Sequence, residues 1–140
     1  MGISARCDYA CRALLALSLH WPNKEPLQLQ HISGKQKIPV KYLVQIFIQL
    51  KRDGLVSSSR GKDGGYLLAK PPDTITLGDV MRCMGGELLT RASSLKKDRS
   101  VFGGVWDQLE NAMTKVVDNV TFEDICKKSQ RMDDVLIFQI

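Results

Sequence analysis

The sequence has no long apolar run, and none approaches the roughly 20 residues that a membrane-spanning helix needs. The N-terminal stretch has an apolar centre, but Asp8 and Arg12 interrupt it and no small-residue cleavage site follows. We therefore expect no secretory signal, no contact with a membrane and a cytoplasmic location. The length of 140 residues fits one domain, or a small domain with an appended interaction helix, and we expect one compact unit.

The sequence also lacks the motifs of common enzyme classes. It contains no HExxH motif, no phosphate loop, no Ser/His/Asp arrangement and no paired carboxylates that a cleft would bring together. His20 and His31 have no cysteine or carboxylate at ligand spacing. We therefore expect that the protein is not an enzyme.

The four cysteines form no CxxC pair and show no spacing of the zinc type, so we expect reduced thiols. Cys83 and Cys126 lie beside apolar helical positions and are expected to fill the core. Cys7 and Cys11 are four residues apart and share a helix face. Two interpretations of this pair stay open, a redox-sensing or soft-metal site and a pair of small buried hydrophobic residues.

Positive charge is concentrated in the first half of the chain. Residues 1–70 hold eleven Lys and Arg against four Asp and Glu, a net +7, whereas residues 71–140 have a net charge of −2. A basic half favours a polyanionic partner such as nucleic acid, although a solvated basic surface gives the same count.

Three helices are predicted in the basic half. Ser4 can cap a first helix that ends near Trp21 and Pro22, and a short second helix begins near residue 27 and is ended by Gly34. Pro39 starts a third helix, which Gly54 stops. Its predicted inner stripe is Val40, Leu43, Ile46, Phe47 and Leu50, and its outer face is Lys41, Tyr42, Val44, Gln45, Ile48 and Gln49. Two short helices of which the second has a polar, basic outer face are typical of a helix-turn-helix.

The next segment predicts a two-stranded wing, with strands at residues 55–60 and 66–69 and a glycine-rich turn between them. Glycines let the turn approach a sugar-phosphate backbone, and Arg60 and Lys62 supply charge there. Pro71 and Pro72 predict an extended exit into a helix with a variant capping box at Thr76, which Gly85 and Gly86 close.

A long amphipathic helix follows a polar loop at residues 87–99. Its apolar face can pack on its own domain or on the same helix of a second subunit. We expect the second arrangement, through Trp106, Leu109, Met113 and Val116. Thr121 caps one more short helix. The apolar tail at residues 135–140 is expected to pack on its own dimer, with docking on another protein as the alternative. The predicted fold is mainly α with a small β-hairpin wing: a winged helix-turn-helix DNA-binding domain at 1–86, a sensor-type loop at 87–100, and a dimerisation helix and tail of the same unit at 101–140.

With these elements in place, the chain resembles the Rrf-two-type winged-helix regulators, the family of the iron-sulfur cluster regulator, the nitric-oxide-sensing repressor and the cysteine metabolism repressor. The resemblance covers nearly the whole chain. It implies a homodimer on a pseudo-palindromic operator, with one recognition helix in each major groove and one wing in each minor groove. The segments that carry it are YACRALL (9–15), VKYLVQI (40–46), residues 54–61, GGYLLA (64–69) and ITLGDV (75–80).

The resemblance also implies DNA contacts. Tyr42 and Gln45 match the family's recognition-helix residues, and Arg60 with Gly61 matches its wing-tip pair. Val44 replaces the usual glutamate, and valine offers only apolar contact, for example with a thymine methyl, so the operator is expected to differ. The full set of expected DNA contacts is Arg6, Tyr9, Gln28, Lys41, Tyr42, Val44, Gln45, Arg60, Gly61 and Lys62.

The sensor positions depart from the family. Cluster-binding members place three cysteines and a histidine where this chain has a residue near Leu88, then Ser94, Ser100 and Gly103. Serine is a poor iron ligand, so we expect no cofactor in the chain as written and an iron-sulfur cluster only if Ser94 and Ser100 replace native cysteines. Whether the lineage lost its cluster or the ligands were replaced stays open.

We therefore expect a dimeric DNA-binding regulator, and a repressor before an activator, because an operator-bound dimer needs no further surface to block polymerase. One alternative is a redox sensor of the iron-sulfur or thiol type. Another is a cysteine-metabolism repressor that receives its signal from a partner protein. The resemblance points to cysteine synthase, which would capture the C-terminal Ile140 carboxylate.

Overall fold

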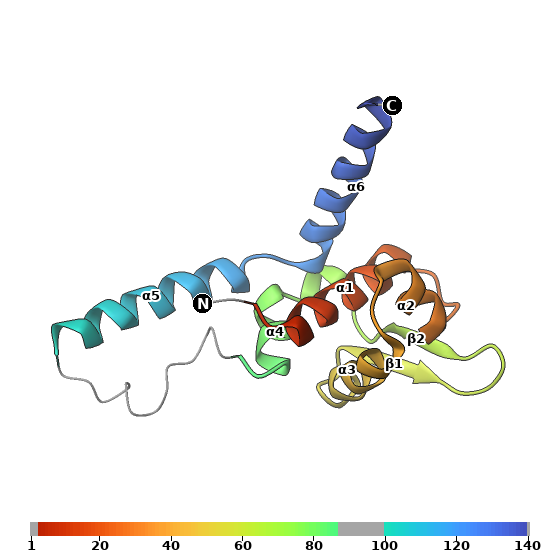
Figure 1. The fold of residues 1–140 in the computed structure, drawn as a ribbon, viewed down its shortest axis with the longest axis horizontal. Helices are drawn as coiled ribbons and strands as arrows, with labels where there is room; N and C mark the ends of the chain where they lie inside the picture. The colour runs from red at the N-terminus through yellow and green to blue at the C-terminus, as the bar shows by residue number, and fades with distance from the viewer. Residues whose placement is uncertain (1–2, 87–99, 140) are drawn as a thin grey trace.

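The computed structural model describes residues 3–86 and 100–139, and the predicted loop at 87–99 lies outside them. Six helices and one antiparallel hairpin form the described fold (Figure 1), which confirms the predicted fold class. The elements are α1 (Ala5–His20), α2 (Leu29–Gln36), α3 (Val40–Arg52), β1 (Val56–Ser59), β2 (Gly65–Leu68), a 3-10 turn (Pro72–Thr74), α4 (Leu77–Cys83), α5 (Val101–Asp118) and α6 (Phe122–Gln139).

Helix α1 begins as predicted. The backbone N–H of Cys7 donates to the Ser4 hydroxyl at 3.1 Å, which satisfies one of the free donors of the first turn. The helix ends at His20, and the ring of His20 is hydrogen-bonded to the carbonyl of Glu25, so this histidine belongs to the helix end.

The boundaries of α2 and α3 correct two predictions. Gly34 lies inside α2, which continues to Gln36 and is ended by Lys37 in the left-handed conformation, with φ of 55°. Pro39 is extended and precedes α3, whose first residue is Val40. Val40 was predicted in the inner stripe, but it is 43% exposed. It is the first residue of α3, and the first residue of this helix that is buried in the core is Leu43.

The core is built around α3. Four inward residues of α3 are fully buried, at spacings of three and four residues that place them on one face: Leu43, Ile46, Phe47 and Leu50. Buried residues of α1, α2 and the loop before α3 surround them: Ala10, Ala13, Leu14, Leu17, Ile32 and Ile38. Cys83 and Cys126 are also buried, as predicted.

The wing is a short antiparallel hairpin in which Val56 pairs with Leu68 and Ser59 with Gly65. It connects to α4 by a different route from the one predicted. Pro71 is extended, but Pro72 begins a 3-10 turn, because proline is well tolerated at the first helical position. The predicted capping box of α4 is complete: the Asp79 N–H donates to the Thr76 hydroxyl, and the Thr76 N–H donates to the Asp79 carboxylate.

Helices α5 and α6 project away from the group formed by α1 to α4 (Figure 1). They are anchored where they meet: Leu77 N–H donates to the Val120 carbonyl at 2.8 Å, and Phe122 N–H donates to the Ile75 carbonyl at 2.9 Å. The capping box of Thr121 and Asp124 opens α6 as predicted. The prediction of a short helix followed by a tail was wrong, because α6 runs on through the apolar segment to Gln139.

None of the helices in the described ranges combines the length and the apolar character that crossing a membrane requires.

Candidate nucleic-acid interface

The outward face of α3 carries the side chains that were predicted to read DNA. Lys41, Tyr42, Val44 and Gln45 are all exposed in the first two turns, opposite the buried face of the helix. This separation of faces leaves the basic and hydrogen-bonding side chains free for an external partner.

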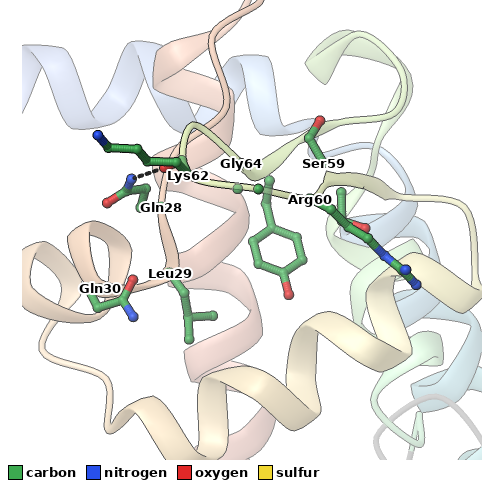
Figure 2. Close-up of a pocket in the computed structure, with 11 residues that line it drawn as sticks. Gln28, Leu29, Gln30, Ser59, Arg60, Lys62 and Gly64 are labelled. Carbon is green, nitrogen blue, oxygen red and sulfur yellow. Dashed lines mark hydrogen bonds between the residues drawn. The ribbon is translucent and has the colours of Figure 1, made fainter.

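The tip of the wing is built from glycines and flanked by cations. Gly61 has φ of +100°, a conformation that glycine adopts readily and other residues rarely do. Gly64 lies so close to the Ser59 carbonyl that an added Cβ would be 2.3 Å from that oxygen. Arg60 and Lys62 are exposed, and their side chains extend in opposite directions from the hairpin (Figure 2).

Two side-chain hydrogen bonds join the wing to the helix-turn-helix. Gln28 Nε2 donates to the Lys62 carbonyl at 3.3 Å, which ties the start of α2 to the wing tip (Figure 2). Lys51 Nζ donates to the Ser58 hydroxyl at 2.7 Å and connects the last turn of α3 with β1. A polar pocket lies between α2 and the hairpin, lined by residues of both. Gln28 therefore braces the wing instead of capping α2, which has no side-chain cap hydrogen bond.

A backbone contact that the sequence interpretation missed fixes the base of the wing. Leu27 N–H donates to the Tyr66 carbonyl at 3.0 Å, and Tyr66 N–H donates to the Leu27 carbonyl at 2.8 Å. Gly65 permits this approach, since a Cβ there would lie 2.3 Å from the Leu27 oxygen. The ring of Tyr66 stacks on Phe47 of α3, with centroids 4.1 Å apart. The alternation LQLQ at residues 27–30 is a strand signal that could have indicated this pairing.

Helix α1 contributes to the same region. The ring of Tyr9 lies 6.2 Å from the ring of Tyr42, so α1 supports the exposed tyrosine of α3. Arg6 is exposed at the first turn of α1. Contact of Arg6 and Tyr9 with DNA stays a prediction.

Cys7 belongs to the buried core, and Cys11 packs against it. Cys7 is buried and Cys11, one turn further along α1, is half-buried. Burial raises the pKa of Cys11 to about 12, with a further rise from Cys7, and burial also raises the pKa of Cys7. Thiolates are the nucleophilic and metal-binding form, so the raised pKa values favour the hydrophobic interpretation.

The face of α5 predicted to form the dimer interface is largely uncovered within one chain. Trp106 is 41% exposed and Leu109 is 40% exposed, Val116 is exposed as well, and Met113 is half-buried. The C-terminal end of α5 is held on α4, where Arg82 forms an ion pair with Asp118 at 2.7 Å that lowers the pKa of the aspartate. An anchored helix with an exposed apolar face presents that face at a fixed place.

The described sensor positions do not fit an iron-sulfur cluster. Ser94 and the position near Leu88 lie outside the described residues. Ser100 is the N-cap of α5 and offers only a hydroxyl, and Gly103, in the first turn of α5, has no side chain. Within residues 3–86 and 100–139, no three His, Cys, Asp or Glu side chains come together as a metal site.

Comparisons with known proteins agree with this geometry. The profile of the Rrf2 family, described as an iron-dependent transcriptional regulator, matches residues 3–128. The HTH-type transcriptional regulator IscR of Pectobacterium carotovorum is 32% identical over 95% of this chain and 84% of its own. The structure of CymR, the global cysteine regulator of B. subtilis, has a TM-score of 0.81 and 29% identity, covering 91% of this chain and 98% of that one. IscR of T. potens has a TM-score of 0.78 and 32% identity, covering 92% and 88%.

Proposed function

The chain belongs to the Rrf2 family of transcriptional regulators, and we propose that it acts as a homodimeric repressor on a pseudo-palindromic DNA operator. The main support for this proposal is that side-chain hydrogen bonds hold the wing against the helix-turn-helix. The Gln28–Lys62 and Lys51–Ser58 hydrogen bonds join the basic hairpin, with its glycine-rich turn, to α2 and to α3, whose outer face is exposed.

Each part of this unit suits one component of DNA. Lys41 and the wing cations Arg60 and Lys62 would neutralise phosphates or enter the minor groove, and these contacts position the protein. Gln45 would read a base edge in the major groove, where glutamine pairs with adenine through two hydrogen bonds.

The proposed dimer joins two α5 helices. Trp106, Leu109 and Val116 are apolar and exposed in one chain, and burying them against a second copy removes this surface from water. A two-fold dimer presents two copies of α3 and the wing, which explains why the proposed operator is an inverted repeat.

The test is selection from random DNA with the full chain, followed by sequencing. We expect an enriched inverted repeat whose half-sites are one helical turn or a multiple of it apart. Binding to that repeat should fall steeply as salt rises, because Lys and Arg displace counterions from the phosphates. Recovery of sequences no different from the starting pool would overturn the proposal.

For the signal, we propose a partner protein at the end of α6 in place of a cluster. Val135, Leu136 and Ile137 are exposed in this chain, and CymR, whose structure this chain resembles, is described as a global cysteine regulator. Cysteine synthase is the proposed partner, and the apolar residues at the end of α6 are its proposed contact surface. Deleting residues 135–140 should abolish binding to cysteine synthase in calorimetry and leave dimer mass in sedimentation unchanged. Failure of the intact protein to bind the enzyme would refute this part.

The serines at the sensor positions lead to a second experiment. Anaerobically purified protein should show no visible absorption of an iron-sulfur cluster, because hydroxyls replace thiolates at two ligand positions. The variant with Ser94→Cys and Ser100→Cys is the comparison. Cluster absorption by the unaltered chain would contradict the proposal that its signal does not come from a cluster.

A further inference from the structure

Helix α3 carries an apolar ridge on its exposed side, formed by Val40, Val44 and Ile48. These residues are spaced by four, which aligns them along one ridge of the helix surface. They are 43%, 37% and 48% exposed, in an element whose other large aliphatic side chains are buried. The ridge therefore lies outside the core, on the exposed side of the helix.

The neighbouring ridge of α3 is polar. Lys41, Gln45 and Gln49 follow the same spacing of four, one residue further along. Lys51, beyond Ile48, is held by its hydrogen bond to Ser58. A protein partner would have to offer an apolar surface for this ridge together with a carboxylate for Lys41 and hydrogen-bonding groups for the two glutamines beside it. DNA supplies phosphates for the cation and base edges for the glutamines, so DNA is the occupant that suits both ridges.

Within the major groove, only one base group matches a hydrocarbon side chain. The four base pairs present donors and acceptors, and thymine alone adds a C5-methyl group. We propose that the apolar ridge reads thymine, contacting the methyl groups of a thymine-rich tract of about three to four base pairs in each half-site. This inference rests on the proposed function and names the sequence class that the recognition helix selects.

The length of the tract follows from helix geometry. Val40 and Ile48 are eight residues apart, which at about 1.5 Å per residue gives a ridge of about 12 Å. Base pairs rise by about 3.4 Å, so the ridge spans about three to four of them.

Side-chain chemistry adds two supporting arguments. Valine and isoleucine are branched at Cβ and hold one rotamer in a helix, so they lose little side-chain freedom on contact. Gln45 on the polar ridge pairs best with adenine, the partner of thymine, so the two ridges favour the same A·T base pairs.

The experiment uses the full chain and a duplex obtained by selection from random DNA. Each thymine of one half-site is replaced by uracil, which removes only the methyl group, and affinity is measured by fluorescence anisotropy. We expect at least two positions at which the replacement weakens binding about fourfold, the value of one methyl group taken out of water. Uracil in the spacer between half-sites is the DNA control and should leave affinity unchanged.

Protein variants show whether the methyl contacts belong to the ridge. With Val44→Ala or Ile48→Ala, the uracil effect should disappear at one thymine and persist at the others, as in a double-mutant cycle. Both residues are exposed, so these variants should fold, which circular dichroism checks. Leu19→Ala, at an exposed apolar residue of α1, is the matched control and should keep every uracil effect.

The outcomes separate the inference from the function on which it rests. An enriched motif whose thymines can all be replaced without loss would overturn the thymine reading and leave the regulator function standing. Uracil effects that persist unchanged in both ridge variants would also overturn it. The absence of any enriched motif would overturn both.

Discussion

Replacing Gly65 by alanine tests how closely the wing is bound to the helix-turn-helix. The new Cβ would lie 2.3 Å from the Leu27 carbonyl oxygen, a distance that must grow to at least 3.0 Å, an increase of at least 0.7 Å. The two backbone hydrogen bonds between Leu27 and Tyr66 are 3.0 and 2.8 Å long, and such a shift would break or severely weaken both.

The magnitude follows from those bonds. Each intramolecular hydrogen bond contributes about 0.5–1.5 kcal/mol net, so losing the pair should lower the free energy of unfolding by about 1–3 kcal/mol. That loss is smaller than the roughly 5–15 kcal/mol typical of a domain, so Gly65→Ala should still fold. The same shift displaces the wing tip. Operator binding should therefore weaken by no more than the binding free energy of the Arg60 contact, which is about 1–3 kcal/mol.

The assays are urea denaturation followed by circular dichroism, and fluorescence anisotropy on the selected operator. Gly34→Ala is the matched control, because Gly34 lies within α2 with nothing within 4 Å of an added Cβ. Removing a glycine from a helix interior should raise the free energy of unfolding by about 0.5–1 kcal/mol and leave DNA binding unchanged. Equal stability and operator affinity of Gly65→Ala and the unaltered protein would show that the close approach of Gly65 to Leu27 does not exist in solution.

Four further predictions concern the interface, the dimer and the thiols. Arg60→Ala should weaken operator binding by about 1–3 kcal/mol, measured by fluorescence anisotropy. An equal loss of affinity for random DNA would mean that Arg60 contacts only phosphate, and no loss on either DNA would mean that the wing does not contact DNA. Gln45→Ala should relax the preference at one base pair of each half-site in a repeated selection, whereas an unchanged motif would mean that another face of α3 reads the bases. Leu109→Asp should give monomers in sedimentation and much weaker operator binding, because one half-site holds a single subunit poorly; a variant that remains dimeric would place the interface elsewhere. Cys11, whose pKa is raised by burial to about 12, should resist iodoacetamide at pH 8 in the folded protein and react after unfolding. Rapid labelling in the native state would contradict this and favour the sensor interpretation.

Much of the fold could be predicted because helix-capping residues and the spacing of apolar residues indicate the same helices that the core requires. Ser4, Thr76 and Thr121 are hydroxyl residues at helix starts, and each was predicted to be a cap and is one. The burial of Leu43, Phe47 and their neighbours follows from the spacing of apolar residues in α3.

The errors arose where two signals competed. Gly34 carries a helix-ending preference, but the buried Ile32 holds α2 on the core and the helix continues for two more residues. The apolar residues 135–137 were separated from a short helix, although the same stretch can continue α6 as a helix with exposed apolar side chains.

The sequence predicted the exposed side chains of the candidate site, but it did not predict the contacts between residues that are distant in the chain. Sequence position indicates that Gln45 and Arg60 are exposed and polar, but it cannot show which backbone groups meet. The contacts of Gln28 with Lys62 and of Leu27 with Tyr66 join residues more than thirty positions apart. They depend on how the wing folds back over α2, which no local pattern specifies.

In the proposed complex, two copies of the unit formed by α3 and the wing read an inverted repeat together. Analytical ultracentrifugation of the full chain with a labelled duplex measures it directly, using the complete selected repeat and the same duplex with one half-site scrambled. We expect two chains on each complete repeat and at least a hundredfold weaker binding to the scrambled duplex, since linking two sites raises avidity by about 10²–10⁴. Equal affinity for the two duplexes, or one chain on each complete repeat, would contradict it.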